Sequence, residues 1–357
     1  MSADTLPVTV LTGFLGAGKT TLLNHLGKTG ALTDTLIVIN EFGQVGLDHL
    51  LMIEAKDELV VELSDGCVCC TLHGALTDAI LDAFQARAAA GQAPFRRVVI
   101  ETSGVSDPTS IAKALTMDPA LSDRFHLEAI VTLIDAGQGR DNLQRFEEAA
   151  AQIALADLIL ITKTDAVATD AQAGLTTALA SRNPFAKIRA IAHGRVDGRE
   201  IFDPDLRLSR PLLLLDEAPH VGAGTLMGAG GMLAGLTAPQ ARAHGGRYRV
   251  TSFEASSPLP PSAVNGWCMT MLPLLGQDVL RFKAVLDVQG AEQPFVLHGV
   301  QGVSGPGIWL EAWPQARRVS RMVFISETHV QPLVDKGLEA FFEGAFVRAS
   351  AAARPPT

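Results

Sequence analysis

Residues 13 to 21 read GFLGAGKTT, a glycine-rich turn that ends in a lysine and two threonines. An apolar run from Val8 to Leu11 precedes this turn, and a helical pattern follows it. The first N–H groups of a helix have no partner within the helix, so such a turn surrounds phosphate oxygens with backbone amides. The order of strand, glycine-rich turn and helix therefore predicts a phosphate-binding P-loop and, with it, an α/β fold around a parallel sheet.

Each residue of the turn has an expected role. Lys19 is predicted to reach the β and γ phosphate oxygens, and the Thr20 hydroxyl to ligate Mg²⁺. The residues predicted to bind the nucleotide in this turn are Gly13, Gly16, Ala17, Gly18, Lys19, Thr20 and Thr21.

Short runs rich in Val, Ile and Leu alternate with longer helical patterns up to about residue 215. Strands of a parallel sheet that is buried on both faces have this character. Strands are expected at Val8–Leu11, Leu36–Asn40, Leu59–Leu63, Arg97–Glu101, Ala129–Ile134, Leu158–Thr162 and Ile188–Ile191.

The order of elements changes in the last third of the chain. Residues 218–246 are rich in Gly and Ala without a clear period, which is typical of a linker. Beyond it, runs of strands flanked by two helices predict a small α+β domain. The predicted division is a P-loop domain over 1–217, the linker over 218–246, an α+β C-terminal domain over 247–345 and a disordered tail over 346–357.

The elements expected in the C-terminal domain begin with a strand at Tyr248–Glu254 and a helix at Ser262–Leu275. Four strands and a last helix follow, at Val279–Val288, Phe295–Gln301, Ile308–Trp313, Met322–Ser326 and Val330–Phe342.

Composition excludes several classes of protein. The formal net charge of −9 gives no basic excess for a nucleic acid, so no nucleic-acid partner is expected. The apolar runs are far shorter than the ~20 residues of a membrane helix, so no membrane association is expected either. The N-terminus has no basic segment before its first apolar stretch, which predicts a cytoplasmic protein rather than a secreted one.

An acid at the end of a neighbouring strand holds Mg²⁺ in P-loop NTPases. The segment RVVIETSG supplies Glu101 for this role, and Gly104 after it permits close approach of the backbone to a γ-phosphate. Asp135, which follows another predicted strand, is a rival for the same role.

The residues that recognise the base of the nucleotide are expected at the end of a later strand. Residues 162 to 165 read TKTD and are similar to the N-K-x-D element, with Thr162 in the first place, followed by Lys163. The carboxylate of Asp165 can accept hydrogen bonds from N1–H and N2–H of guanine, which adenine does not offer. GTP is therefore the predicted nucleotide.

Three of the four cysteines fall within four positions, at Cys67, Cys69 and Cys70. Thiolates so close together repel one another unless a cation lies among them, and soft sulfur ligands favour Zn²⁺, Cu⁺ or a borderline metal such as Co²⁺. Three thiolates leave the fourth ligand open to water, a carboxylate or a donor from the recipient. The fourth cysteine, Cys268, lies in an apolar helical pattern and is expected in the core.

Glu41 follows the second predicted strand, in the segment NEFG. Its carboxylate has three possible roles at that edge: to ligate Mg²⁺ through water, to ligate the transition metal, or to cap a turn.

Five motifs in order carry a resemblance to a known family: GFLGAGKTTLL, NEFG, ELSDGCVCC, ETSGVSDP and TKTD. With them the chain resembles the CobW family of metallochaperone GTPases, and the similarity extends from about residue 7 to 342. The resemblance implies a P-loop NTPase fold with a G domain of the SIMIBI class and a CobW-type C-terminal domain. It further implies slow GTP hydrolysis, Zn²⁺ or Co²⁺ bound by Cys67, Cys69 and Cys70 next to Mg-GTP, and Glu41 as a further metal ligand.

The partner that the resemblance implies is a client metalloprotein or metal-requiring enzyme, and the chain is expected as a monomer or as a nucleotide- or metal-dependent dimer. Many relatives carry a His-rich tract between the domains, whereas residues 218–246 contain only His220 and His244. A carrier of one metal ion, rather than a store, is therefore expected.

Three other functions remain open at this point. The cysteines can hold a structural zinc ion while the GTPase only signals to its client. The C-terminal domain can dock the client while the cysteines carry no cargo. A small-molecule kinase on a P-loop scaffold is the third, and Asp165 disfavours it.

Overall fold

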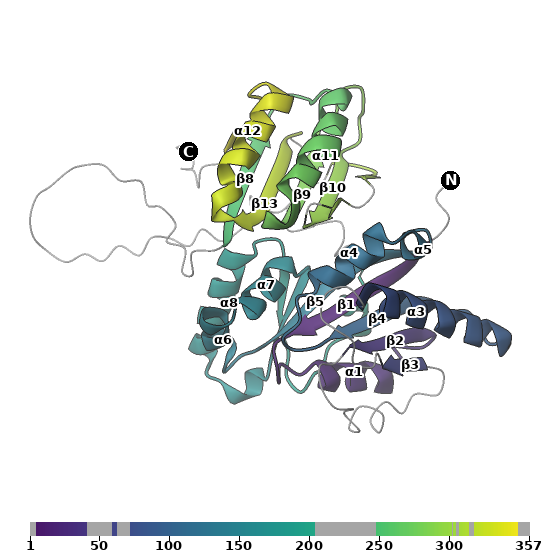
Figure 1. Cartoon of the computed structure of the whole chain (residues 1–357). Coiled ribbons are helices and arrows are strands. Elements are labelled where there is room, and N and C mark those ends of the chain that lie inside the picture. Colours follow the sequence, from purple (N-terminus) through teal and green to yellow (C-terminus); the bar gives the residue numbers. More distant parts are fainter. Residues whose placement is uncertain are drawn as a thin grey trace, which may run out of the picture.

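The computed structural model describes residues 5–40, 59–62, 72–203, 248–301, 303–304, 307–313 and 318–348. They form two parts, each built around a seven-stranded sheet (Figure 1). None of the described helices is long and apolar enough to cross a membrane.

The N-terminal sheet is parallel throughout and has the strand order β3-β2-β4-β1-β5-β6-β7. Its strands are β1 (Leu6–Gly13), β2 (Thr35–Asn40), β3 (Leu59–Glu62), β4 (Arg97–Thr102), β5 (Phe125–Asp135), β6 (Leu158–Thr162) and β7 (Lys187–Ala190). All seven strands expected in this half are therefore confirmed, although β5 begins four residues earlier than predicted.

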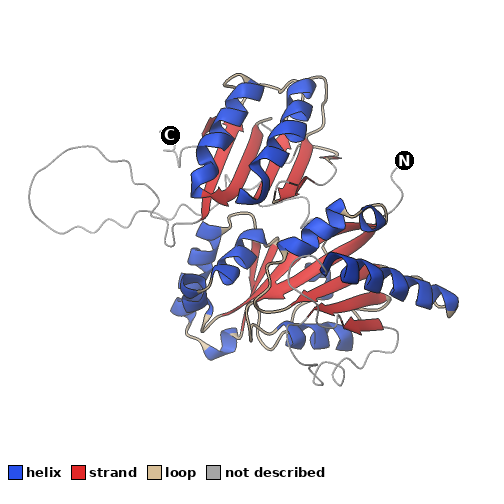
Figure 2. Cartoon of the chain, viewed as in Figure 1, coloured by secondary structure: helices blue, strands red, loops and turns tan. Residues whose placement is uncertain are grey.

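Helices cover both faces of this sheet (Figure 2). They are α1 (Lys19–Lys28), α3 (Leu72–Ala89), α4 (Thr109–Met117), α5 (Pro119–Ser122), α6 (Gly139–Arg145), α7 (Glu147–Leu155), η1 (Thr164–Ala166), α8 (Thr169–Arg182) and α9 (Gly198–Ile201). In β2, Leu36 and Val38 pack in one apolar cluster with α3 and α4, whereas Ile37 and Ile39 pack in another with α1. Burial of alternate residues on opposite faces explains why these strands read as continuous apolar runs.

The C-terminal sheet is antiparallel, with the order β11-β10-β9-β13-β8-β14 and β12 paired to β10. Its strands are β8 (Tyr248–Ala255), β9 (Val279–Leu286), β10 (Phe295–Val300), β11 (Val303–Ser304), β12 (Ile308–Trp309), β13 (Ser320–Glu327) and β14 (Val347–Arg348). Its helices are α11 (Pro261–Leu275), η3 (Gly276–Asp278), η4 (Thr328–Val330) and α12 (Gln331–Phe342). The α+β prediction for this part is confirmed.

Two details differ from the expectation. The strand predicted at Ile308–Trp313 has only two paired residues, Ile308 and Trp309. Residues 346–348 were predicted to belong to the disordered tail and instead include β14 (Val347–Arg348), which pairs with β8, whereas 349–357 lie outside the described residues. Phe346 explains this, because its ring packs edge to face on Phe342 with the ring centroids 5.1 Å apart. The predicted linker, 218–246, lies outside the described residues.

The two faces of the C-terminal sheet pack on different partners. One face lies against α11 and α12, and includes Phe282 and Phe324. Apolar side chains of the other face, such as Leu280 and Ile325, belong to the same cluster as residues of α4 and α7. All eight residues of β9 are buried as a result. The C-terminal sheet is thus enclosed between its own two helices and the N-terminal part (Figure 1).

Candidate nucleotide-binding site

The glycine-rich turn joins β1 to α1 at the carboxyl edge of the parallel sheet. Gly13 has φ 141°, and a Cβ at this position would lie 2.4 Å from the carbonyl oxygen of Leu133. Gly18 has φ 99°, a left-handed conformation that favours glycine, and it is the N-cap of α1. No side chain caps α1. The turn thus leads directly into the N-terminus of α1, the end of a helix at which anions are favoured.

The lysine of the P-loop motif bonds to the first glycine of the turn. The Nζ of Lys19 donates a hydrogen bond to the carbonyl oxygen of Gly13 at 2.9 Å, and the side chain is buried. Thr20 is the second residue of α1. Both residues thus lie at the start of α1, next to the glycine-rich turn.

Glu101 lies on the strand next to the P-loop strand. β4 pairs with β1, and Glu101 is opposite Leu11, two residues before the turn begins. Its side chain is 1% exposed. One residue further on, the hydroxyls of Thr102 and Thr12 are hydrogen-bonded at 2.8 Å, which ties the ends of the two strands together.

Asp135, the rival acid, has a different partner. Its Oδ2 lies 2.8 Å from the Nζ of Lys163, and its Oδ1 accepts hydrogen bonds from the amides of Gly137 and Gln138. Burial raises the pKa of Asp135, but the hydrogen bonds from Lys163 and the two amides outweigh it, so that the pKa lies below its usual value. Asp135 therefore belongs with the TKTD segment.

The TKTD segment follows β6 and touches the P-loop directly. The Thr162 hydroxyl donates to the carbonyl oxygen of Ala17 at 2.8 Å. Lys163 has φ 55°, and this left-handed residue turns the chain into η1, where Asp165 is exposed. Asp165 thus lies three residues after Thr162, the residue that contacts the P-loop.

A third loop, after β7, was not predicted. The Thr164 hydroxyl donates to the carbonyl oxygen of Ile191 at 3.1 Å. Gly194 has φ 67°, and a Cβ on it would lie 3.1 Å from the carbonyl oxygen of Thr21. The loop from Ile191 to Gly194 therefore lies between the TKTD segment and the start of α1. The glycine after a short strand is the one signal in the sequence that points to it.

Gly104 lies against the P-loop. A Cβ on Gly104 would come within 2.7 Å of the backbone nitrogen of Leu15, so only glycine allows this contact. The carbonyl oxygen of Gly104 accepts a hydrogen bond from the buried side chain of Gln152 at 3.2 Å. Sequence reasoning missed Gln152, because a lone glutamine in a helix belongs to no motif.

Four of the predicted site residues lie outside the described residues: Glu41, Cys67, Cys69 and Cys70. The described residues that flank them are Asn40 at the end of β2, Glu62 at the end of β3 and Leu72 at the start of α3. Cys268, by contrast, is described. It is half-buried and packs against the apolar cluster of the C-terminal part, so it lies at the edge of the expected core, and burial raises the pKa of its thiol to about 11.

Among the described residues, one group has metal-ligand chemistry: Asp278, Glu327 and His329 in the C-terminal part. The ring of His329 lies between the two carboxylates, with Nε2 3.3 Å from Asp278 and Nδ1 3.4 Å from Glu327. Each ring nitrogen thus faces a different carboxylate, which fits hydrogen bonding better than a single shared ion.

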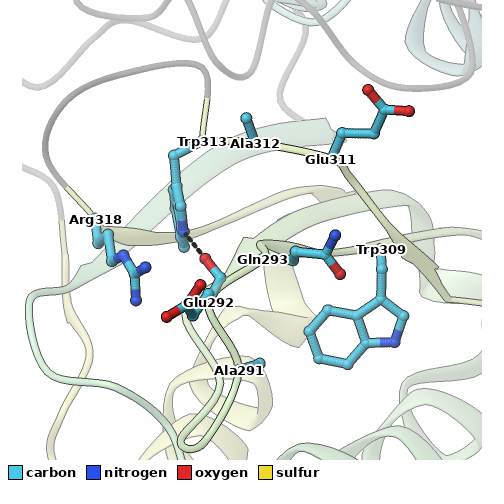
Figure 3. A pocket seen from close by; sticks show the side chains of 8 residues that line it. All are labelled: Ala291, Glu292, Gln293, Trp309, Glu311, Ala312, Trp313 and Arg318. Carbon is cyan, nitrogen blue, oxygen red and sulfur yellow. Dashed lines mark hydrogen bonds between the residues drawn. The ribbon is translucent and has the colours of Figure 1, made fainter.

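Two surface hollows lie away from the P-loop. One of about 670 Å³ is on the C-terminal part, where the indole of Trp313 donates to the carbonyl oxygen of Glu292 at 3.0 Å and Trp309 forms the opposite side (Figure 3). The other, of about 1090 Å³, is lined by the C-terminal end of α1 and by residues around α9. Neither includes a residue of the P-loop, so both are separate from the nucleotide site.

Two protein-family descriptions match the chain. "CobW/HypB/UreG, nucleotide-binding domain" matches residues 7–189, which contain the P-loop, Glu101 and the TKTD segment. "Cobalamin synthesis protein cobW C-terminal domain" matches residues 248–342.

Curated relatives agree with these matches. The chain is 30% identical over 321 residues to the zinc chaperone YjiA of Escherichia coli (strain K12), which covers 90% of this chain and 93% of YjiA. It is 34% identical over 210 residues to zinc-regulated GTPase metalloprotein activator 1 of Schizosaccharomyces pombe, over 57% of this chain and 50% of that protein.

A solved structure shares the fold. The crystal structure of Zn(II)-bound YjiA GTPase from E. coli superposes with a TM-score of 0.67 at 24% sequence identity, over 95% of this chain and 99% of that one. The parallel sheet with its P-loop and the separate antiparallel C-terminal sheet are thus one known architecture. Together, the two matched domains and a relative aligned over nine-tenths of the chain show that it belongs to the CobW/HypB/UreG family and carries the CobW C-terminal domain.

Proposed function

We propose that the chain is a GTP-dependent metallochaperone that binds Zn²⁺ or Co²⁺ at Cys67, Cys69 and Cys70 next to Mg-GTP and releases the metal to a client protein when GTP is hydrolysed. The observation that carries the proposal is the meeting of the P-loop, Glu101 and the TKTD segment at one edge of the sheet. The strands that lead to the cysteines end at this same edge.

GTP is the proposed nucleotide because of Asp165. Its carboxylate is exposed and comes three residues after Thr162, which is hydrogen-bonded to the P-loop. This carboxylate can accept hydrogen bonds from both N–H groups of guanine. In this proposal the aliphatic stem of Lys163, held at its head by Asp135, covers one face of the base. The loop after β7 is proposed to close the other side.

The phosphates are proposed to lie against the amides between Gly13 and Thr21, with Lys19 exchanging its bond to Gly13 for the β and γ oxygens. Thr20 and Glu101 supply a hydroxyl and a carboxylate, the oxygen donors that suit Mg²⁺. When bound, Mg²⁺ would neutralise charge that develops on the phosphates. We assign no side chain as a base, because this reaction depends mainly on positioning and charge stabilisation, and we expect slow hydrolysis.

The position of the metal is proposed from chain connectivity. Parallel pairing brings the ends of β3, β2, β4 and β1 to one edge, with Ile39 opposite both Glu62 and Glu101. Cys67 follows Glu62 by five residues, a length that spans at most ~18 Å when extended. Adjacent strands lie ~4.8 Å apart, so three strand spacings separate β3 from β1 by roughly 14 Å. The chain after β3 is therefore long enough for the cysteines to reach the phosphates, and Glu41 follows the last residue of β2 directly.

The names of the relatives support the metal and the client. One is called a zinc chaperone and another a zinc-regulated GTPase metalloprotein activator. We propose by analogy that the recipient is a metalloprotein or metal-requiring enzyme, and that zinc is the first metal to test. The thiolates suit Co²⁺ as well.

A zinc-release experiment tests the proposal. The chain is loaded with one Zn²⁺, mixed with Mg-GTP and a chromogenic zinc chelator in excess, and zinc transfer is followed beside phosphate release. We expect zinc to be transferred to the chelator at the rate of GTP hydrolysis. Transfer should stay slow when GDP replaces GTP, and also in the Lys19→Ala variant. Zinc that is retained while GTP is hydrolysed would instead support a structural zinc site in a GTPase that activates its client without carrying cargo.

A further inference from the structure

Helix α7 lies between the Gly104 loop (Ser103–Ser106) and the C-terminal domain. Gln152 on this helix is 1% exposed, and its Nε2 donates to the carbonyl oxygens of Gly104, at 3.2 Å, and Ser106, at 3.0 Å. Both amide hydrogens of the side chain therefore serve one loop. The backbone carbonyl of Gln152 accepts from the Thr132 hydroxyl at 2.9 Å, which fixes the helix to β5.

The Gly104 loop in turn is seated on the P-loop. Its glycine backbone lies so close to Leu15 that a methyl group would meet the Leu15 nitrogen at 2.7 Å. A displacement of the loop would therefore open or close the space beside the P-loop. Because positional errors of ~1 Å can cost ~100-fold in rate, the position of this loop can set the rate of GTP hydrolysis.

The other end of α7 holds the C-terminal domain. The guanidinium of Arg281, on β9, donates to the carbonyl oxygen of Leu155, the last residue of α7, and to the carboxylate of Asp157. The Nζ of Lys283, also on β9, lies 3.1 Å from Asp157, whose second oxygen accepts from the Ile130 amide at 2.9 Å. All three charged side chains are at most 5% exposed. Since undocking would leave buried charges without their partners, this cluster favours one docked position of the domain.

A second helix connects the same loop to the same domain. The chain runs from Ser106 into α4, where the Asp107 carboxylate accepts from the Thr109 amide at 2.9 Å. α4 contacts β10, and Ile111 and Leu115 of α4 share an apolar cluster with Val296 and Val300 of that strand. Both helices attached to the Gly104 loop therefore pack on the C-terminal sheet.

We propose that the C-terminal domain holds the Gly104 loop in its hydrolysis-competent position through α7, with Gln152 and Arg281 as the positioning residues at the two contacts. This inference rests on the proposed GTPase function. A domain that docks a client can in this way change the rate of hydrolysis without touching the nucleotide. By linkage, the nucleotide that orders the loop must also favour the docked domain.

Steady-state GTP hydrolysis by the full chain tests the proposal, with one variant at each contact. Gln152→Leu removes both bonds to the loop, and Arg281→Met removes the main bond between β9 and α7. We expect each variant to lower kcat by ~10-fold or more and to leave KM within ~3-fold, because positioning acts on the transition state more than on substrate binding.

Matched controls separate positioning from general loss of stability. Gln331→Leu removes a buried amide that bonds only within the C-terminal domain, to Thr251 and Ser326. Arg321→Met breaks an ion pair with Glu254 between β13 and β8. Both are expected to keep kcat close to that of the wild type at temperatures where every variant is folded.

A double-mutant cycle provides the sharpest readout. If one helix links the two contacts, Gln152→Leu and Arg281→Met are non-additive, and the double variant has nearly the kcat of the worse single variant. Wild-type kcat in both single variants, or fully additive effects, would overturn the proposal. A wild-type chain that does not hydrolyse GTP at all would instead refute the proposed function.

Hydrogen exchange on the wild-type chain keeps the test decisive if Arg281→Met does not fold. Amides of α7 and β9 are expected to exchange more slowly with a non-hydrolysable GTP analogue than with GDP. Equal exchange in the two states contradicts the coupling.

Discussion

The hydroxyl of Thr162 donates a hydrogen bond to the carbonyl oxygen of Ala17, with 2.8 Å between the two oxygens. The first residue of the TKTD segment therefore fastens the base-reading loop to the P-loop, across 145 residues of sequence. The same hydroxyl lies 3.3 Å from the carbonyl oxygen of Ile134, so it bridges β6, β5 and the P-loop. A threonine meets this structural need in place of asparagine.

Replacing Thr162 with valine is expected to weaken GTP binding. Valine keeps the shape of threonine but leaves the buried Ala17 carbonyl without its donor, at a cost of about 1–3 kcal/mol. Titration with a fluorescent GTP analogue should show roughly 5- to 150-fold weaker binding. Thr162→Ser keeps the hydroxyl and serves as the control, and valine and serine variants of equal affinity would mean that the bond has no role in nucleotide binding.

Glu101 and Asp135 are expected to respond differently to loss of charge. Glu101→Gln removes the proposed Mg²⁺ ligand, so the difference in GTP affinity between Mg²⁺ and EDTA should disappear, and kcat should fall by ~100-fold. Asp135→Asn frees Lys163 instead, and should leave the effect of Mg²⁺ in place. If Asp135→Asn abolished the effect of Mg²⁺ and Glu101→Gln did not, the Mg²⁺ ligand would be Asp135.

Gly104→Ala is expected to impair hydrolysis for a steric reason. The added methyl group would lie 2.7 Å from the Leu15 nitrogen, so the loop has to move away from the P-loop. Gly74→Ala is the control, because no atom lies within 4 Å of its Cβ position in α3 and alanine stabilises a helix by about 0.5–1 kcal/mol. We expect kcat to fall ~10-fold or more in the first variant only. Normal turnover by Gly104→Ala would show that the close contact is not needed.

Lys283 is expected to make the free energy of unfolding depend on pH in the alkaline range. Burial, together with the Arg281 cation, lowers the pKa of Lys283 to about 8 from 10.5, although Asp157 opposes the shift. Between these values the unfolded chain binds the proton that the folded chain has lost, so this residue makes the free energy of unfolding rise with pH. The full effect is on the order of 3 kcal/mol.

Lys283→Met is expected to remove this rise. Urea unfolding at a series of pH values from about 8 to 10.5 measures it as the difference in slope between the variant and the wild type. The exposed Lys336 provides the control variant Lys336→Met, which should keep the wild-type slope. Identical slopes in all three proteins would mean that Lys283 is not desolvated in the docked interface.

Much of the fold was predictable because buried parallel strands must be apolar on both faces. Val98, Val99 and Ile100 face alternately into two apolar clusters, and this is visible as an unbroken run. The P-loop and TKTD segments were predictable for a different reason, since their chemistry demands particular residues at fixed spacing.

Other features depend on which strands and helices become neighbours. Glu101 and Asp135 both lie at the carboxyl ends of strands, and only the residues that surround each of them distinguish the two acids. Gln152 donates hydrogen bonds to two carbonyl oxygens that are 46 and 48 residues away in the sequence. No local sequence pattern therefore marks it. The pairing of β14 likewise follows from packing of Phe346 on the C-terminal helix.

In the proposed function, GTP controls metal affinity at the cysteines. The most direct measurement is a competitive titration of Zn²⁺ and Co²⁺ into the chain with Mg²⁺ and a non-hydrolysable GTP analogue, and again with GDP, for the wild type and Cys69→Ser. We predict metal affinity more than ~100-fold higher in the GTP state, a coupling of roughly 3 kcal/mol, and its collapse in Cys69→Ser. Equal metal affinity with the two nucleotides would contradict the account and leave the cysteines as a structural metal site.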